Sequence, residues 1–352
     1  MSIEMRAAVY HGINDLRVES LPEPEPGTGE ALLKVLSAGI CGTDLRIFER
    51  GHFRIPIGAR RVLGHEVVGE VIEVGEGVDL QVGTRVTVAP NIGCGSCKQC
   101  NSGWTNLCPD YEAFGVTLDG GFAEYMLITA SAIQQGNIAT LPSHIPDNTA
   151  ILTEPLSCCI NGQEAVAVGL GDVVLVMGAG PIGLMHMLLA KVNGARKLII
   201  SEPNTWRLRQ AEFFGADVFI NPEQQNIQDV IFETTAGMGV DVVIVANASP
   251  RAQRQALEMT QPRGRINFFG GLPKGVSEVG LNTNLIHYKQ LLVTGTTGSN
   301  VRQFHSANHL ISTRGIELVN LVSNFFPLEM IHQGLECAQS GMALRVVIKS
   351  GM

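Results

Sequence analysis

A glycine-rich turn between two apolar segments limits the fold more than any other feature of this 352-residue sequence. The turn spans Gly178–Gly183, with the sequence GAGPIG, and follows the aliphatic run Val173–Met177. Immediately after it, Gly183–Val192 has the length and apolar content of a buried helix. A strand, a glycine turn and a helix in this order begin a βαβ unit, which requires a parallel sheet covered by helices.

The alternation of aliphatic runs and helical segments continues to about residue 295. Runs that are apolar throughout are typical of strands buried on both faces, so this part is predicted to be a doubly wound, parallel α/β sheet. The predicted helices include Gly183–Val192 and Thr205–Phe214. The predicted strands are Val173–Met177, Lys197–Ser201, Asp217–Ile220, Asp241–Ala246, Arg265–Phe269 and Leu291–Thr294.

The first 150 residues or so follow a different pattern, in which short apolar runs are separated by turn residues such as the sequence PEPEPG at 22–27. This spacing predicts a β-rich domain. After about residue 296, a helix and the run Arg345–Lys349 are expected to return to that first domain. The predicted domains are therefore 1–150, 151–295 and a returning segment, 296–352. The apolar runs of the first domain are Ala31–Leu36, Val67–Val74, Thr84–Ala89 and Gly121–Ile128.

The composition excludes several classes of protein. Forty glycines with 45% hydrophobic and 16% charged residues are typical of a large core with tight turns and exclude a disordered chain. A net charge of −8 disfavours a nucleic-acid-binding surface. The stretch 173–190 lacks acidic and basic residues apart from His186, but its glycines favour a buried strand and helix over a membrane span. No secretory signal is recognised, so we expect a cytoplasmic protein with neither nucleic acid nor a membrane as its partner.

The glycine turn predicts a dinucleotide site. In that fingerprint Gly178 makes the turn, Gly180 lets the pyrophosphate approach the backbone, and Gly183 allows close packing of helix and strand. Glu202 follows the second predicted strand and would bond the ribose hydroxyls and repel a 2′-phosphate, which favours NAD over NADP. The alternative is a glycine turn in a protein that binds no nucleotide. The predicted cofactor residues here are Gly178, Gly180, Pro181, Ile182, Gly183, Glu202 and Arg207, the last beside the adenine.

Four of the eight cysteines form a local cluster: Cys94, Cys97, Cys100 and Cys108. In a chain of this length without a recognised secretory signal, such spacing favours a metal over disulfides. Four thiolates from one loop suit a closed, structural zinc site. An iron–sulfur cluster is the alternative, although the last spacing of seven residues differs from the three of the bacterial ferredoxin motif. A loop without metal is the third possibility.

A second candidate metal site is dispersed along the chain. Its members are Cys41 in the sequence GICGTD, His65 and Glu66 in GHE, and Glu154 in TEP. A thiolate, an imidazole and carboxylates together can hold a catalytic zinc that keeps a position open for water or substrate. Taken singly, Cys41 has the alternative of a small buried residue and His65 that of a structural histidine.

Together, in this order along the whole chain, these motifs resemble the zinc-dependent medium-chain alcohol dehydrogenases, nearest the sorbitol (polyol) and threonine dehydrogenase branch. The resemblance implies a GroES-like, β-rich catalytic domain joined to a Rossmann domain, with the active site in the cleft. It implies Cys41, His65 and one or both of Glu66 and Glu154 on the catalytic zinc, and Thr43 at the start of a proton relay. It further implies Arg345 near the cofactor phosphates. Residues beside the nicotinamide would be Phe269, Gly270, Gly271, Gly295, Thr296 and Thr297.

The chain departs from that branch at three positions. Arg46 and Asn91 stand where threonine dehydrogenases carry histidines, and Asn161 stands where sorbitol-type enzymes often carry one. Arg46 cannot act as a base at neutral pH, so the end of the proton relay stays open and threonine is less favoured. The surrounding segment is basic, which suits either a solvated loop or subunit contact, or an anionic polyol substrate. Its arginines are Arg46, Arg50, Arg54, Arg60 and Arg61.

The prediction is a zinc- and NAD-dependent enzyme that oxidises a secondary alcohol of a polyol or sugar derivative, which is neutral, phosphorylated or acidic. Two zinc ions per subunit, one catalytic and one structural, and NAD are the expected cofactors, and a homo-oligomer is expected, with a tetramer favoured over a dimer. The alternatives within the enzymes are L-threonine 3-dehydrogenase and a simple-alcohol dehydrogenase. An inactive structural protein that binds zinc and NAD is the alternative outside them, and a zinc-ribbon nucleic-acid binder is disfavoured by the charge.

Overall fold

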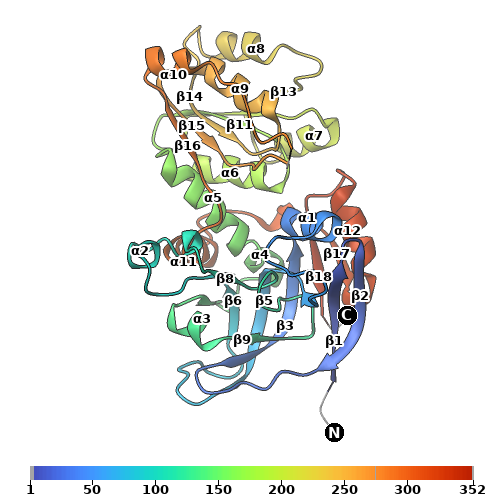
Figure 1. Cartoon of the computed structure of the whole chain (residues 1–352). Coiled ribbons are helices and arrows are strands. Elements are labelled where there is room, and N and C mark those ends of the chain that lie inside the picture. The colour runs from blue at the N-terminus through green and yellow to red at the C-terminus, as the bar shows by residue number, and fades with distance from the viewer. Residues whose placement is uncertain (1–3, 274, 351–352) are drawn as a thin grey trace. The chain divides into compact units, whose positions relative to one another are not determined.

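The computed structural model describes residues 4–273 and 275–350. The chain forms two compact units, one made of Met1–Ser157 and Gly298–Met352 and the other of Cys158–Thr297. The first unit therefore contains both ends of the chain, and the second is a continuous segment inserted between them (Figure 1).

The second unit contains a six-stranded parallel sheet in the order β13-β12-β11-β14-β15-β16. The order reverses between β11 and β14. Because βαβ crossovers are right-handed, the helices that follow β11 and β12 cover one face and those that follow β14 and β15 cover the other. The strands are β11 (Val173–Met177), β12 (Lys197–Ser201), β13 (Val218–Ile220), β14 (Val240–Val245), β15 (Thr260–Phe268) and β16 (Leu292–Gly295). The helices are α6 (Pro181–Val192), α7 (Thr205–Phe213), α8 (Ile227–Thr234), α9 (Pro250–Met259) and α10 (Thr283–Lys289), and α5 (Thr153–Ala165) begins in the first unit.

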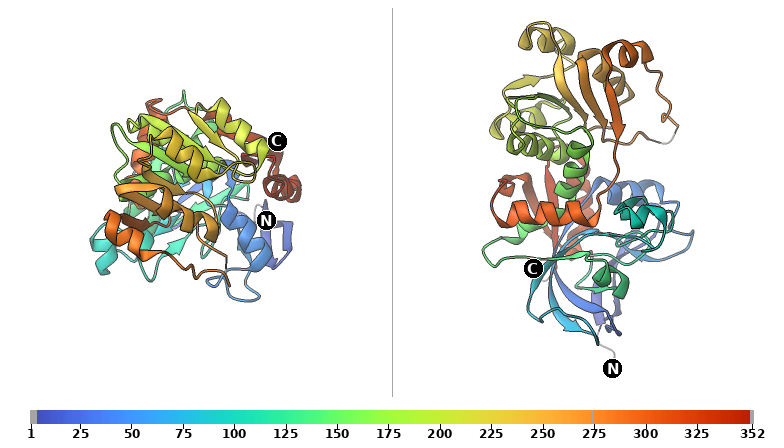
Figure 2. Two further views of the ribbon diagram at one scale, coloured as in Figure 1. Left: turned by 90° about the horizontal axis from the view of Figure 1, so that it is seen from above. Right: turned by 90° about the vertical axis from the view of Figure 1, so that its left-hand side faces the viewer.

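The first unit is β-rich. Its seven-stranded sheet runs β10-β6-β5-β3-β18-β17, with β9 also pairing with β3, and a second sheet runs β2-β1-β4. The last strand, β18 (Arg345–Lys349), pairs antiparallel with β3 (Ala31–Ile40), so red and blue segments lie side by side in this unit (Figures 1 and 2). The other strands are β1 (Glu4–Gly12), β2 (Asp15–Pro22), β4 (Arg61–Val62), β5 (Glu66–Val74), β6 (Arg85–Val88), β9 (Tyr125–Ile128), β10 (Ile138–Thr140), β17 (Val322–Pro327), and the pair β7 (Asn91–Ile92) and β8 (Glu112–Ala113).

The helices of the first unit are short, and several begin or end at the loops that carry the candidate ligands. They are α1 (Gly42–Arg50), α2 (Lys98–Asn101), α3 (Ala130–Gln134), α4 (Asp147–Ala150), α11 (Val301–Ser312) and α12 (Ile331–Gln339). No helix in residues 4–273 or 275–350 combines the length and the apolar content that crossing a bilayer requires.

The predicted elements match the structure best where a strand is buried on both faces. β11, β12 and β18 span the predicted residues. The expected strand Gly121–Ile128 begins only at Tyr125, because Gly121 and Phe122 bond instead to the carbonyls of Gly64 and Leu63. The described part of the segment after residue 296 holds two α-helices, two short 3-10 helices and the extra strand β17, which pairs in parallel with β18, where a single helix and a final strand are expected.

Candidate functional site

Three of the four dispersed ligand candidates meet in the first unit. Cys41 lies between β3 and α1, and His65 and Glu66 lie at the start of β5. Because β5 pairs antiparallel with β3, Gly39 is the register partner of Glu66, and Cys41 follows two residues later. One ligand atom from each of Cys41, His65 and Glu66 lies within 4.8 Å of the other two. A Cβ on Gly39 would overlap the Glu66 carboxylate, so the glycine makes room for it.

Asp44 orients this cluster, and the sequence analysis gave it no role. Its side chain is fully buried. One carboxylate oxygen accepts a hydrogen bond from the backbone N–H of Cys41 at 2.8 Å. The other lies 3.4 Å from Nδ1 of His65. Such a carboxylate partner fixes the ring orientation and leaves Nε2 for a metal. The signal in the sequence was an aspartate three residues after Cys41, at the third position of a helix that begins there.

The charges of the cluster are strongly coupled. Burial raises the pKa of the Cys41 thiol, but the charge of His65 and its hydrogen bond outweigh this effect and lower the pKa below its ordinary value, to about 7. Burial lowers the pKa of His65, but Asp44 and Cys41 outweigh it and hold that pKa well above its ordinary value. Burial raises the pKa of Glu66 well above the range of an exposed carboxyl, against the opposing charge of Arg345. A divalent cation would favour the deprotonated forms of the thiol and the carboxyl, as metal ligation requires.

Arg345 belongs to this cluster rather than to the second unit. Its guanidinium is buried, and Nη1 lies 3.0 Å from Oε1 of Glu66 and donates to the carbonyl of Ile40 at 2.9 Å. The sequence analysis placed Arg345 at the cofactor phosphates, and that contact stays a prediction. In the structure, Arg345 contacts Glu66 and the carbonyl of Ile40, beside the candidate metal ligands.

Glu154 lies near the cluster but outside the group of ligand atoms. Its side chain is buried in the first turn of α5, and its charge acts on both Glu66 and Arg345. Its carboxylate is not among the ligand atoms that lie within 4.8 Å of one another. The role of Glu154 as a zinc ligand therefore stays a prediction.

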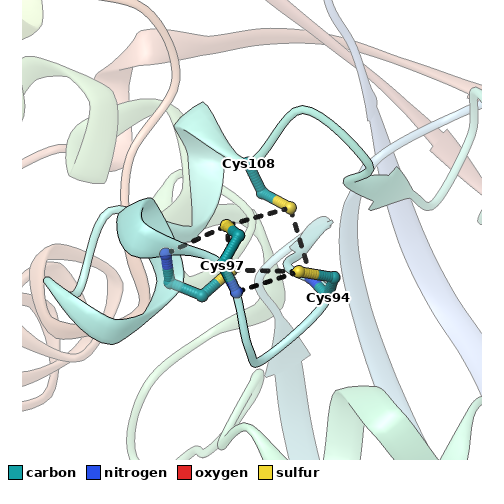
Figure 3. A group of neighbouring side chains, drawn as sticks. Cys94, Cys97 and Cys108 are labelled. Carbon is teal, nitrogen blue, oxygen red and sulfur yellow. Dashed lines mark hydrogen bonds between the residues drawn. The ribbon is translucent and has the colours of Figure 1, made fainter.

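The four clustered cysteines converge in the loop from β7 to β8. The sulfur atoms of Cys94, Cys97 and Cys108 face one another (Figure 3). The Sγ–Sγ distances are 3.5 Å for Cys97–Cys100, 3.8 Å for Cys97–Cys108 and 4.0 Å for Cys94–Cys100. A tetrahedral zinc ion with Zn–S bonds of about 2.3 Å needs sulfur atoms roughly 3.8 Å apart. Backbone N–H groups of Cys94, Cys97 and Cys100 also point at sulfur atoms of the set, at 3.3–3.5 Å. The residues present fit a structural zinc.

The predicted cofactor residues of the second unit follow the carboxyl ends of its strands. The glycine turn follows β11, Glu202 follows β12, and the Phe269 and Gly295 segments follow or end β15 and β16. These ends meet at one edge of the parallel sheet, and the strand order reverses there between β11 and β14. Open α/β sheets bind their ligands outside this edge, at the point of reversal.

The glycine turn has the geometry of a phosphate cradle. Gly178 has a φ of +116°, and a Cβ on Gly183 would overlap the carbonyl oxygen of Gly178. A Cβ on Gly180 would have only Arg207 Nη1 at 4.0 Å, so the backbone there is open to a ligand. Gly180 caps α6 without a side chain, and Pro181 and Ile182 start the helix, whose N-terminus favours an anion.

The Glu202 side chain is held in place by backbone hydrogen bonds, one of them from the glycine turn. Its two carboxylate oxygens accept hydrogen bonds from the backbone N–H groups of Ala179 at 2.8 Å and Asn204 at 2.9 Å. The side chain is buried, so its orientation is fixed. The predicted contacts of Glu202 with the ribose and of Arg207 with the adenine stay predictions.

The residues predicted to flank the nicotinamide form two strand ends. The Thr296 hydroxyl donates to Oδ1 of Asn267 at 3.3 Å, which ties the end of β16 to β15. The Phe269 ring packs edge-on against the imidazole of the fully buried His186, with ring centroids 4.6 Å apart. Gly270 is packed against the backbone of Asn247, whereas Gly271 has open space around it. His186 had been noted only as the polar member of an apolar stretch.

Comparisons with known proteins place this architecture in a family. Residues 27–137 match the family model of the alcohol dehydrogenase GroES-like domain, and residues 181–313 match that of zinc-binding dehydrogenases. The L-threonine 3-dehydrogenase of Pyrococcus furiosus is 36% identical over 330 residues, 92% of each chain. The sorbitol dehydrogenase of Halalkalibacterium halodurans is 32% identical over 98% of this chain and 99% of its own. A crystal structure of a zinc-binding dehydrogenase from Sinorhizobium meliloti bound to NADP has a TM-score of 0.91 at 30% identity, covering 99% of both chains.

The chain belongs to the zinc-dependent medium-chain alcohol dehydrogenases. The predicted fold class, a GroES-like domain with a Rossmann domain, is confirmed by the two family models. This dehydrogenase acts on CH–OH groups, and zinc and a nicotinamide dinucleotide are its cofactors.

The structure separates the arginines of the basic segment of this dehydrogenase. Arg60 pairs with Glu19, Arg61 with Asp119 at 2.9 Å, and the exposed Arg50 approaches Glu49 at 3.7 Å. Arg54 donates to backbone carbonyls, as described below. Arg46 differs, because Nη2 donates to the Thr43 hydroxyl at 2.9 Å, and no carboxylate stands among the partners recorded for it in residues 4–273 and 275–350.

Proposed function

We propose that this dehydrogenase oxidises a secondary alcohol of a polyol or sugar derivative to a ketone, with NAD as the hydride acceptor. The observation that carries the proposal is the group formed by the partly buried Cys41 and the buried His65 and Glu66. One thiolate, one imidazole and one carboxylate suit a zinc site that leaves a position for the substrate. When bound there, zinc supplies a Lewis acid that polarises the substrate hydroxyl.

Two neighbouring side chains orient the candidate ligands and balance their charge. Asp44 sets the orientation of His65, and Arg345 balances the buried charge of Glu66. Thr43 would take the proton of the substrate hydroxyl and pass its own toward the nicotinamide ribose and solvent. Because Arg46 donates to the Thr43 oxygen, the hydroxyl hydrogen of Thr43 is free to point elsewhere. Arg46 itself cannot receive the proton.

The choice of NAD rests on Glu202. Bound dinucleotide supplies the hydride acceptor, and its phosphates would lie on the open backbone at Gly180. The Glu202 carboxylate is fixed beside this turn by Ala179 and Asn204. A fixed negative charge at the end of the second strand of such a sheet accepts ribose hydroxyls and repels a 2′-phosphate.

The substrate class rests on similarity and on Arg46. The sorbitol dehydrogenase from H. halodurans covers nearly the whole chain, which favours a polyol. Arg46, with a neutral hydroxyl as its recorded partner, could take a phosphate or carboxylate on that polyol by charge-assisted hydrogen bonds. L-threonine is the second candidate, because the threonine dehydrogenase from P. furiosus is 36% identical and threonine also carries a carboxylate.

A substrate panel tests this proposal. The purified enzyme is assayed by NADH absorbance with neutral polyols, sugar phosphates, sugar acids, simple alcohols and L-threonine at matched concentrations. The proposal expects the highest kcat/KM for a polyol or sugar derivative. Turnover of L-threonine at least tenfold above every polyol would establish the second candidate instead.

We also propose a cytoplasmic homo-oligomer, with a tetramer favoured over a dimer. None of the eight cysteines, all of which lie in the part of the chain that the structure describes, forms a disulfide, which suits a reducing compartment. β16 ends the parallel sheet with an open edge, and Leu292 on it is exposed, which suits a subunit contact. The molar mass in solution by light scattering tests the oligomer.

A further inference from the structure

The loop over residues 51–60 connects the two segments that carry the metal-ligand candidates. It begins where α1 ends, after Cys41, Thr43 and Arg46, and it leads into β4, shortly before His65. The loop is therefore connected through the chain to both sides of the cluster.

Arg54 fastens this loop to the four-cysteine loop. Its Nη2 donates to the carbonyl of Pro109 at 2.8 Å, and its Nη1 donates to the carbonyl of Tyr111 at 3.3 Å. The guanidinium also lies over the Tyr111 ring, 4.1 Å from the centroid. Pro109 directly follows Cys108, and the N–H of Tyr111 donates to the Cys108 carbonyl at 3.3 Å. The position of Cys108 thus fixes both acceptors of Arg54.

The tip of the loop has little packing of its own. The side chain of Phe53 is 86% exposed. Its ring stacks on the ring of the neighbouring His52, and the Arg54 guanidinium lies over the Phe53 ring, 5.6 Å from the centroid. The backbone N–H of Arg54 donates to Nδ1 of His52 at 3.2 Å. Burial, then the positive charges of Arg54 and Arg46, lower the pKa of His52.

We propose that Arg54 is a positioning residue through which the fold of the four-cysteine loop sets the conformation of loop 51–60 beside the substrate. A guanidinium supplies two parallel donors and a flat face for the Tyr111 ring, which a lysine cannot reproduce. Without metal, Cys108 is no longer held to the other three thiols, so the carbonyls of Pro109 and Tyr111 lose their fixed places. The kinetic part of this inference rests on the proposed function, whereas its conformational part does not.

The test compares Arg54→Ala and Arg54→Lys with Arg60→Ala, a matched control that removes an exposed arginine of the same loop. Chymotrypsin cleavage after Phe53, followed by mass spectrometry, reports how often the loop opens. For Arg54→Ala we expect unchanged zinc content, cleavage about tenfold faster, and a KM for the best polyol raised three- to tenfold with kcat changed less than twofold. Arg54→Lys should lie between, and Arg60→Ala should match the wild type.

A second experiment, in which one zinc ion is removed by substitution, tests the link between Arg54 and the four-cysteine loop. Cys97→Ser should lose one zinc and speed cleavage after Phe53 as much as Arg54→Ala does, and the double variant should show no further increase. Additive effects, or cleavage unchanged in either single variant, would overturn the proposal.

If Cys97→Ser does not fold, the variant Tyr111→Leu takes its place. This substitution removes the ring that stacks on Arg54 and keeps the backbone carbonyl of residue 111. Its expected cleavage rate lies between those of the wild type and Arg54→Ala, and a wild-type rate would count against the proposal. Absence of polyol turnover would contradict the proposed function, whereas the cleavage experiment would still test the conformational role of Arg54.

Discussion

Arg345 and Glu66 form a buried ion pair, with Nη1 of the one 3.0 Å from Oε1 of the other, although they come from opposite ends of the chain. The pair exists because β3 has β5 on one side and β18 on the other. The last strand, β18, thereby places a fixed positive charge beside the candidate metal ligands Cys41, His65 and Glu66. Without it, the buried Glu66 carboxylate would lose its ion-pair partner.

Arg345→Met should destabilise the protein strongly, because it keeps much of the volume and removes the charge. Breaking a buried ion pair on one side costs about 3–5 kcal/mol of unfolding free energy, measured by urea denaturation. The double variant Arg345→Met/Glu66→Gln should lose less than Arg345→Met alone. Arg17→Met, which removes an exposed partner of Asp15, is the control with a small expected effect. A loss for Arg345→Met no larger than that of this control would refute the role of the pair.

Cys100→Ser should reduce the zinc content from two ions per chain to one, measured by elemental analysis. The loop from β7 to β8 depends on the metal for its fold, so the melting temperature should also fall. Cys337→Ser, which changes a partly buried cysteine outside the cluster, should retain both ions. Iron with visible absorbance in the wild-type protein would contradict the zinc assignment.

Glu202→Ala should lower the preference for NAD over NADP. In the wild type we expect kcat/KM for NAD to exceed that for NADP at least tenfold, or about 1.4 kcal/mol. The variant should weaken NAD binding most, since the carboxylate also holds the N–H of Ala179 in the glycine turn. Glu212→Ala, which removes an exposed charge from α7, should leave the ratio unchanged. A wild-type preference for NADP would show that the interpretation of Glu202 is wrong.

Arg46→Ala should distinguish anionic from neutral substrates. Loss of a hydrogen bond to a charged group costs about 1.5–3 kcal/mol, so kcat/KM for a phosphorylated or carboxylated polyol should fall ten- to hundredfold. A neutral polyol should lose much less. Arg50→Ala, an exposed arginine of the same helix, is the matched control. Equal small losses on both substrates, at low and at high salt, would mean that Arg46 is a solvated surface charge and the substrate is neutral.

The parallel sheet, the glycine turn and the four-cysteine loop could be predicted from the amino-acid sequence alone. These are local patterns. β11 is apolar throughout, β12 is apolar at its three central positions, and the four thiols lie on one short loop whose spacing allows few arrangements. Residue type alone made Cys41, His65 and Glu66 candidate ligands, and the order of their motifs, which resembles that of a family, strengthened the prediction that they form one site.

Only the tertiary structure decided which distant residues meet. Arg345 was predicted at the cofactor and has its partners at Glu66 and Ile40, because the pairing of β18 with β3 carries it there. The arginines of 46–61 look alike in sequence, yet Arg54 binds carbonyls, Arg60 and Arg61 bind acids, and Arg46 binds a hydroxyl. A side chain's partner depends on which strand or loop the fold brings within a few ångströms. Residue type and spacing along the chain do not encode that distance for segments far apart.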